Sequence, residues 1–295
     1  MQPTPNRVLM SIDGHTVAAD VHLRDDQRPP VVFFHGLLTS LVVATELFVD
    51  PAAESWIALS LPGHHPGAFP AGLSRKDVDA ELFAALADES LSRLIGERRV
   101  IAAGWSTGGF AAVNLAIRRP RRVVAVASLA GFTGGRVTGV IGWLQWLARG
   151  PVGEACLRAG FWVGGRVPGL QDAIIRSCTA DRAAAALVPE AVLARIRADF
   201  RHHDPGALAA MLAAVREIDI GDRLGDVRVP AWIACGGLDP VIPFAETARL
   251  ADGIAGARLK VYESGGHLFF SEWPGVREDF AAWRRGLAAG GPESA

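Results

Sequence analysis

The chain has 295 residues, of which 50% are hydrophobic, and its 30 lysines and arginines nearly balance its 31 acidic residues. This balance gives no overall field that would attract nucleic acid or an anionic membrane. No stretch reaches the roughly 18 apolar residues that a membrane span needs.

The three cysteines are odd in number and widely spaced, so neither a disulfide framework nor a zinc knuckle is expected. The first residues, "MQPTPNRVLM", contain two prolines and no apolar core of the kind that signal peptides carry. We therefore expect a cytoplasmic protein with reduced thiols and without membrane insertion.

Short apolar runs alternate with helical patterns through the first 130 residues. An antiparallel pair of strands is predicted at 6–12 and 15–23, turning at Asp13-Gly14. This alternation is typical of an α/β protein with a mostly parallel central sheet and helices on both faces. The remaining predicted strands of this part are 31–34, 56–60, 100–104 and 123–131, and the predicted helices are about 74–96 and 107–118.

The strand at 31–34 runs into His35-Gly36, within "FFHGLLTS". Glycine allows a sharp turn there, so that the backbone amide of Leu37 can point into a crevice at the strand ends. His35 is expected to brace its own loop rather than transfer protons, and it is also a candidate substrate contact.

The strand at 100–104 leads into "GWSTGG", with Ser106 at its centre. A turn from strand to helix must be tight here, and Gly104, Gly108 and Gly109 remove side chains that would collide. Such a corner lifts a serine hydroxyl above the sheet edge, beside free helix amides. The pattern alone is also compatible with a simple flexible turn.

The alternation of predicted strands and helices stops after Gly131. Tryptophan-rich and alanine-rich segments broken by glycine and proline predict short helices there. We expect a helical cap at 132–220, inserted between a first core part at 1–131 and a second at 221–295. Trp143 and Trp146 are candidates for the substrate pocket, with packing inside the cap as the alternative.

Strand and helix alternate again in the last part, with two polar residues directly after strands. The predicted elements are a strand at 229–236, a helix at about 243–254, a strand at 257–264 and a helix at about 275–288. Asp239 follows the first of these strands in "CGGLDPVIP", and His267 follows the second in "ESGGHLFF". Since parallel strands open into one crevice at their carboxyl ends, Ser106, Asp239 and His267 are expected to converge there.

A serine hydroxyl is a weak nucleophile that needs a neighbouring base, itself oriented by a carboxylate. Ser106 is the predicted nucleophile, His267 the base and Asp239 the orienting acid. The amides of Leu37 and Thr107 would form an oxyanion hole.

These motifs, His35-Gly36, "GWSTG", "GGLD" and Gly266-His267, resemble those of α/β-hydrolase-fold serine hydrolases with a helical cap, over nearly the whole chain. The resemblance implies that substrate enters between cap and sheet and that an acyl-serine intermediate is hydrolysed by water. Trp105 before the nucleophile is similar to carboxylesterases acting on carrier-linked esters, and it is a candidate pocket wall or indole donor.

The resemblance implies a hydrolase of carboxylic esters or thioesters with a hydrophobic acyl group. Acyl transfer and carbon–carbon bond hydrolysis by the same residues remain alternatives, as does a non-catalytic ligand-binding protein. The expected partner is a small-molecule acyl substrate, with a carrier-linked form as one option, and no oligomeric state is predicted.

No cofactor and no metal are expected. His64-His65 and His202-His203 lack the helical spacing of a zinc motif. In the family, Ser60 stands where an acidic residue is common and His65 where a glycine is common, so His64 or His65 is a candidate for the site entrance.

Overall fold

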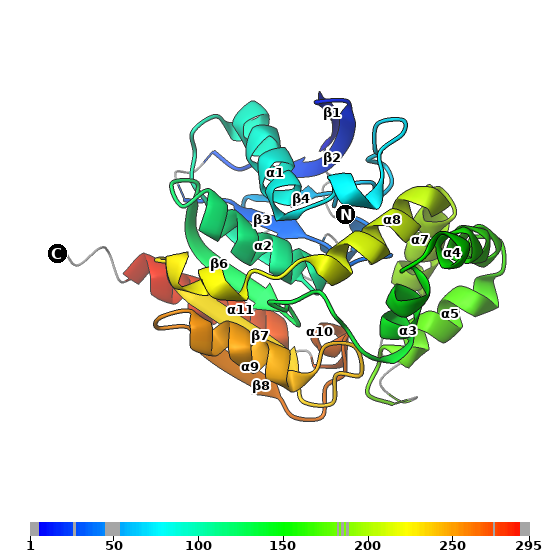
Figure 1. Cartoon of the computed structure of the whole chain (residues 1–295). Helices are drawn as coiled ribbons and strands as arrows, with labels where there is room; N and C mark the ends of the chain where they lie inside the picture. Colours follow the sequence, from blue (N-terminus) through cyan, green and yellow to red (C-terminus); the bar gives the residue numbers. More distant parts are fainter. Residues whose placement is uncertain are drawn as a thin grey trace.

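The computed structural model describes residues 6–25, 28–44, 54–181, 183, 186, 189–273 and 275–289. Eight strands in this part of the chain form one sheet in the order β1-β2-β4-β3-β5-β6-β7-β8 (Figure 1). β1 pairs antiparallel with β2, and β2 with β4, while all other neighbours are parallel. The strands are β1 (Asn6–Ile12), β2 (His15–His22), β3 (Val31–Phe34), β4 (Trp56–Leu59), β5 (Val100–Trp105), β6 (Val123–Leu129), β7 (Ala231–Gly236) and β8 (Arg258–Tyr262).

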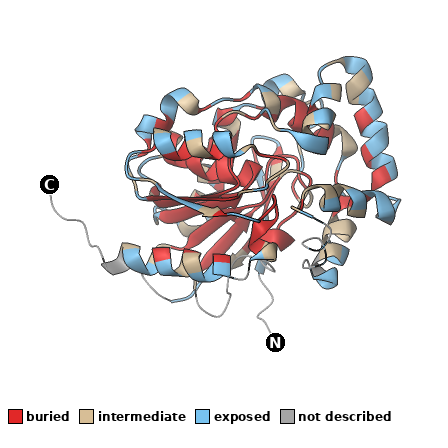
Figure 2. Ribbon diagram, turned by 90° about the horizontal axis from the view of Figure 1, so that it is seen from below, coloured by how far each residue is buried: buried red, intermediate tan, exposed pale blue. Residues whose placement is uncertain are grey.

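Helices cover both faces of the sheet because successive strand residues point to opposite sides. Val32 and Phe34 of β3 share an apolar cluster with helices α1 (Ala80–Ile95), α2 (Thr107–Arg118) and α9 (Phe244–Gly253). Val31 and Phe33 share the other cluster with α10 (Phe269–Glu272) and α11 (Gly275–Ala289). The inner strands β3, β4, β5 and β7 are buried along their length, whereas the edge strands β1 and β8 carry exposed residues (Figure 2). The expectation of a mostly parallel sheet with helices on both faces is confirmed.

Helices α3 (Gly139–Leu147), α4 (Pro151–Gly164), α5 (Pro168–Ser177), α7 (Glu190–Phe200) and α8 (Pro205–Glu217) occupy the chain between β6 and β7. They gather at one side of the sheet (Figure 1). Leu157 and Phe161 of α4 pack there with Phe200 and Leu208 in an apolar cluster separate from the two sheet clusters. We call these helices the cap, and we propose the division at 132–220 that the sequence suggested.

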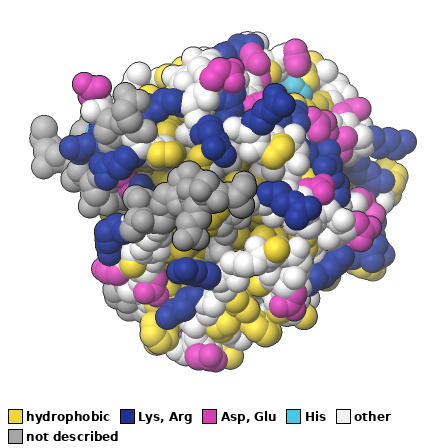
Figure 3. Space-filling view, turned by 90° about the vertical axis from the view of Figure 1, so that its left-hand side faces the viewer, with side chains coloured by type: hydrophobic (Ala, Val, Ile, Leu, Met, Phe, Trp, Pro, Cys, Tyr) yellow, Lys and Arg dark blue, Asp and Glu magenta, His cyan; other side chains and the backbone are white. Residues whose placement is uncertain are grey.

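The face opposite the cap carries basic and acidic side chains interspersed with hydrophobic ones (Figure 3). This mixture accords with the near-zero net charge of the whole chain. No described helix is both long and apolar enough to cross a membrane.

Several strands are a few residues shorter than predicted, and three helical segments differ from the prediction. The expected helix at 74–96 is split into a short 3-10 helix, η2 (Arg75–Asp77), and α1, because Asp79 caps α1 by accepting a hydrogen bond from the Leu82 amide at 2.8 Å. A second 3-10 helix, η3 (Gly221–Asp226), precedes β7, and α10 follows β8 in a stretch that was expected to be loop.

Candidate active site

Ser106 lies at the junction of β5 and α2, in a backbone conformation that L-residues rarely adopt, with φ 57° and ψ −122°. The glycines around it allow close backbone contact. A Cβ on Gly104 would lie 2.2 Å from the Gly108 carbonyl oxygen, and one on Gly108 would lie 2.0 Å from the Phe34 carbonyl oxygen. The corner is therefore held rigid by packing, unlike a flexible turn.

His267 bridges Ser106 and Asp239. Its Nε2 lies 3.0 Å from Ser106 Oγ, and its Nδ1 lies 2.8 Å from Asp239 Oδ2. Ser106 and His267 are 7% and 4% exposed, so this chain of hydrogen bonds is largely shielded from water. With Nδ1–H donating to the carboxylate, Nε2 is free to accept the serine proton. The structure thus brings together the three side chains that the sequence predicted to converge.

Asp239 is fixed by its own loop. Its Oδ1 accepts hydrogen bonds from the amides of Val241 at 2.8 Å and Ile242 at 2.9 Å, while Oδ2 faces His267. The Asp239 side chain is 1% exposed. Both carboxylate oxygens therefore have partners, and the one facing the imidazole is held in place.

The backbone of His267 is held from two sides. Its carbonyl accepts a hydrogen bond from Trp105 Nε1 at 2.9 Å, and its amide donates to the Cys178 carbonyl at 2.9 Å, just beyond α5. The neighbouring amide of Gly266 donates to Glu272 Oε2 at 2.7 Å. Trp105 is therefore an indole donor, one of the two roles considered from the sequence, and the cap contributes directly to the histidine loop.

The residues proposed to form the oxyanion hole line the same pocket as Ser106. Thr107 is the first residue of α2, so its amide is one of those that a helix leaves without an internal acceptor. Leu37 also lines the pocket, and the next residue, Leu38, has a positive φ of 62°. The Leu38 amide donates to His64 Nε2 at 3.3 Å, which ties the turn to the loop after β4.

Three histidine rings form a buried column behind this turn, with ring centroids 5.2 Å apart between His35 and His64 and 5.3 Å apart between His64 and His203. His35 Nδ1 contacts the Gly36 carbonyl, and its Nε2 accepts from the Leu61 amide. His203 Nδ1 accepts from the His65 amide at 2.8 Å. The column joins the predicted oxyanion turn to the cap segment between α7 and α8.

Burial keeps these rings neutral. Desolvation lowers the pKa of His35 from 6.5 to about 3, with a contribution from His64, and lowers the pKa of His64 to about 4. Desolvation and the neighbouring histidines lower the pKa of His203 to about 2. The hypothesis that His64 or His65 faces the site entrance is wrong for His64, whose ring is fully buried beneath the turn at Leu38, and His65 is not among the residues that line the pocket.

The pocket above Ser106 is bounded by the cap on one side and the core on the other. Two glutamines of the cap line it: Gln145 bonds the Gly135 carbonyl and the Val137 amide, whereas Gln171 Nε2 donates to the Gly164 carbonyl and Gln171 Oε1 has no hydrogen-bond partner among the described residues. The walls are otherwise mainly apolar. The cap residues that line it are Val137, Ile141, Gln145, Gln171, Ile174, Ile175, Cys178, Leu193, Ile196, Phe200 and Val215, and the apolar core residues are Leu37, Leu38, Val43, Trp105, Val241, Leu268 and Phe270.

Three candidate substrate contacts lie outside this lining. His35 is fully buried within its own loop, as its expected bracing role requires. Trp143 and Trp146 are 58% and 53% exposed, because α3 turns Ile141 and Gln145 toward the pocket instead. No pattern in the sequence favours that face of α3, since apolar residues occur all around the helix.

Cys178 lines the pocket but is not activated. Burial raises the pKa of its thiol to about 12, so it is uncharged near neutral pH. Among the described residues no group of three or more histidine, cysteine or acidic side chains could hold a metal ion.

Comparisons with known proteins agree with the fold. A model of the "Alpha/beta hydrolase family" matches residues 31–282. A "2-hydroxy-6-oxononadienedioate/2-hydroxy-6-oxononatrienedioate hydrolase" of Klebsiella pneumoniae is 26% identical over 279 residues, covering 90% of each protein. A "pimeloyl-[acyl-carrier protein] methyl ester esterase" of Neisseria meningitidis serogroup B is 28% identical over 243 residues, covering 82% of this chain and 85% of that protein.

Solved structures of similar fold include other hydrolases. The enol-lactonase from Burkholderia xenovorans LB400 superposes with a TM-score of 0.71 at 20% identity, covering 96% of this chain and 100% of that one. An esterase from Exiguobacterium antarcticum gives a TM-score of 0.72 at 19% identity, covering 94% and 98%. The chain thus belongs to the alpha/beta hydrolase family and is an enzyme of the hydrolase type.

Proposed function

We propose that the protein hydrolyses carboxylic esters or thioesters with a hydrophobic acyl group, through a covalent intermediate on Ser106. The observation that carries this proposal is the chain of contacts from Ser106 to His267 to Asp239, at 3.0 Å and 2.8 Å, beneath an apolar pocket. A buried nucleophile, base and orienting carboxylate within hydrogen-bond reach are what acyl transfer requires.

In the proposed mechanism, Ser106 Oγ attacks the carbonyl carbon while His267 Nε2 takes its proton. The developing oxyanion is stabilised by the amides of Leu37 and Thr107. The imidazolium then protonates the leaving alcohol or thiol, whose bond to the acyl carbon breaks. Water attacks the acyl-serine with His267 again as base, which releases the acid and restores Ser106. Asp239 holds the imidazole orientation and stabilises its positive charge in both halves.

The pocket lining supports an apolar acyl group. Cap side chains Ile141, Ile174 and Leu193 line it together with core residues, and the Gln145 amide bonds backbone groups, which leaves Gln171 Oε1 as the one glutamine atom of the described lining without a partner. Apolar walls with few free polar groups favour a hydrophobic ligand. The name of the Neisseria relative, which specifies a carrier-linked methyl ester, is consistent with an ester substrate.

The test is steady-state hydrolysis of p-nitrophenyl acetate, butyrate, octanoate and dodecanoate by the wild type and by Ser106→Ala. We expect kcat/KM to rise with chain length beyond acetate, and Ser106→Ala to lose at least about 10³-fold in kcat. Ser74→Ala is the matched control, because Ser74 only caps η2 at an exposed position.

A flat chain-length profile would argue against the hydrophobic acyl pocket. Wild-type turnover no faster than that of Ser106→Ala would contradict the hydrolytic role and favour a ligand-binding protein. Product formed with an added alcohol faster than free acid would identify an acyltransferase instead.

A further inference from the structure

The outer side of the cap has an unusual density of exposed apolar side chains. Eight of the fourteen large hydrophobic side chains that are exposed in the described part of the chain lie between residues 140 and 170. We define the cap outer face as the six of them that α3 and α4 carry. They are Val140, Trp143, Trp146, Val152, Trp162 and Val163.

Helix α4 is apolar on both its buried and its exposed sides. Leu157 and Phe161 pack into the cap, while Val152, Trp162 and Val163 face outward at 77%, 53% and 44% exposure. A surface helix of a soluble protein usually presents charged or polar residues to water. The exposed side of α4 therefore has the composition of a surface that another apolar phase covers.

Helix α3 likewise has apolar side chains on both its pocket side and its exposed side. Ile141 and Gln145 line the substrate pocket, whereas Trp143 and Trp146 are more than half exposed. By contrast, Trp56, Trp105 and Trp232 in the core are at most 5% exposed. Outside the cap, Trp283 is 8% exposed and Trp273, between α10 and α11, is 40% exposed, so within the described part of the chain indoles that are more than half exposed occur only in the cap.

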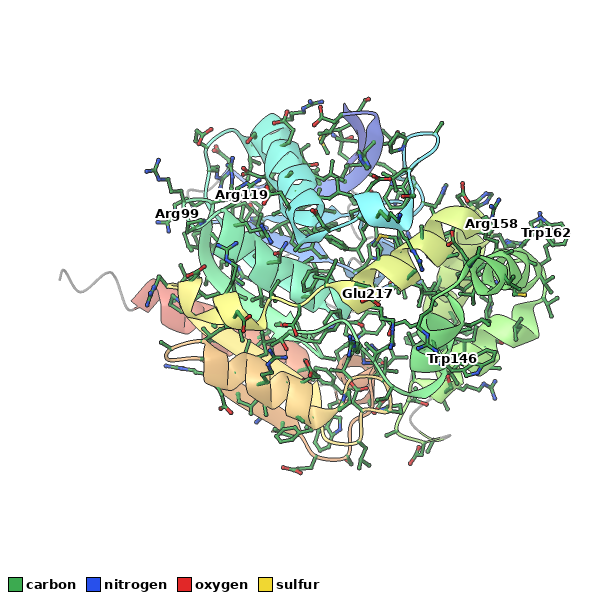
Figure 4. All side chains as sticks on the ribbon, viewed as in Figure 1. Arg99, Arg119, Trp146, Arg158, Trp162 and Glu217 are labelled. Carbon is green, nitrogen blue, oxygen red and sulfur yellow. The ribbon has the colours of Figure 1, made fainter. Side chains whose placement is uncertain are left out.

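The charges at this face are mostly positive. Residues 139–167 contain three arginines and one glutamate, which gives 3 − 1 = +2. The Arg149 guanidinium lies 4.9 Å from the centroid of the Trp146 ring, and the Arg166 guanidinium lies 3.9 Å from that of Trp162. Arg158 is exposed on α4, and Figure 4 shows it near Trp162 at the outer end of the cap.

Acidic groups on the neighbouring cap helices do not cancel this charge. Residues 168–201 contain five arginines and four acidic residues, which gives 5 − 4 = +1, and Asp172 of α5 and Glu190 of α7 share Arg197. Asp199 accepts a hydrogen bond from Ser40 Oγ in the core. The near-neutral balance of the whole chain therefore hides a basic, tryptophan-rich region on one side of the molecule.

We propose that the cap outer face is a docking surface for anionic lipid bilayers, on which the cap rests without spanning them. Tryptophans and arginines on an otherwise apolar helix surface suit the headgroup region, where indoles lie at the interface and guanidinium groups meet anionic headgroups. A second copy of the chain fits less well, because a two-fold interface would bring together two copies of the same surface, both with a net positive charge. This inference does not depend on the chemistry at Ser106.

Docking would bring the helices that line the pocket to the lipid surface. Because α3 contributes to both the pocket and the cap outer face, a hydrophobic ester dissolved in the bilayer would be presented close to the pocket walls. The substrate class proposed above would then be concentrated where the protein binds.

The experiment is cosedimentation of the full-length protein with phosphatidylcholine vesicles that contain or lack phosphatidylglycerol, at low and high salt. We expect binding to the anionic vesicles at low salt, weaker binding at high salt, and little binding to phosphatidylcholine alone. Trp162→Ser and Trp143→Ser should each weaken binding about tenfold, because each removes apolar area that the bilayer would bury. Arg158→Gln should weaken it about fivefold.

Leu9→Ser is the matched control, because Leu9 is 59% exposed on β1, away from the cap, and its replacement should leave vesicle binding unchanged. Unfolding midpoints of all variants show whether each remains folded. The proposal is overturned if the wild type does not sediment with anionic vesicles at low salt, or if folded tryptophan variants bind as well as Leu9→Ser. It is also overturned if the wild type is a dimer that Trp162→Ser dissociates and neither form binds vesicles.

Discussion

Trp105 links the nucleophile turn to the catalytic histidine proposed here. The residue precedes Ser106, its indole donates to the His267 carbonyl at 2.9 Å, and its ring lies 5.1 Å from the His267 ring, centroid to centroid. Its ring also lies so close to Gly36 that a Cβ there would meet it at 2.7 Å. One side chain therefore touches the serine turn, the histidine loop and the oxyanion turn.

We predict that Trp105→Phe lowers kcat about tenfold with little change in fold, because it keeps an aromatic ring but leaves the buried His267 carbonyl unpaired. The measurement is kcat with a saturating ester, compared with the unfolding midpoint. An unchanged kcat in a folded variant would mean that the indole hydrogen bond does not position His267.

We predict that Asp239→Asn lowers kcat by about 10⁴-fold, since an amide cannot hold the imidazole with Nδ1–H directed at it as a carboxylate does. Asp252→Asn, at an exposed position on α9, is the control and should retain full activity. A loss of less than tenfold in Asp239→Asn would remove Asp239 from the proposed mechanism.

At the scale of elements, the turn at 36–38, which we propose as part of the oxyanion hole, is held by segments far away in the sequence. His64 follows β4 and accepts from the Leu38 amide, and His203 comes from the cap and accepts from the His65 amide. The cap also touches the histidine loop, since a Cβ on Gly266 would lie 2.2 Å from the Ala180 amide nitrogen. The two loops that flank the proposed active site are thus both supported by the cap.

We predict that stability falls as the pH drops below about 6.5. The folded-state pKa values of His35, His64 and His203, about 3, 4 and 2, lie below the ordinary value of 6.5. The unfolded chain therefore binds protons first, so the stability is fully present above pH 6.5 and is lost progressively as the pH falls toward the folded-state pKa values. Each histidine contributes a slope of about 1.4 kcal/mol per pH unit.

The measurement is the free energy of urea unfolding between about pH 7 and about pH 5, a range in which histidine titrates. His203→Asn should reduce the slope by about 1.4 kcal/mol per pH unit, because asparagine can accept from the His65 amide but does not titrate. An equal slope in wild type and variant would show that His203 is protonated in the folded protein.

At the scale of the whole molecule, the sequence predicted the mostly parallel sheet. It also predicted that Ser106, Asp239 and His267, each of which follows a strand, would converge at one edge of that sheet. These follow from chain-local signals, namely apolar runs and the glycines beside them. The prediction that Trp143 and Trp146 line the substrate pocket was wrong, because a helix with apolar residues on every side does not reveal which side faces the pocket. Two contacts between the cap and the core could not be predicted, because no local pattern links residues so far apart in the chain. His203 accepts a hydrogen bond from the His65 amide, more than a hundred residues earlier, and the Cys178 carbonyl accepts one from the His267 amide, nearly ninety residues later.

The arrangement of the whole molecule favours one kind of chemistry. A serine buried beneath the cap, hydrogen-bonded to an imidazole and under an apolar pocket, supports the proposal of a covalent acyl intermediate. The central claim is therefore that Ser106 becomes acylated.

The most direct test is mass spectrometry of peptides from protein that is quenched by acid during turnover of p-nitrophenyl octanoate. We predict an octanoyl group on the peptide that contains Ser106, and none on the same peptide of Ser106→Ala. Rapid hydrolysis by the wild type with no acyl group trapped on Ser106, or an acyl group found on another residue, would contradict the account.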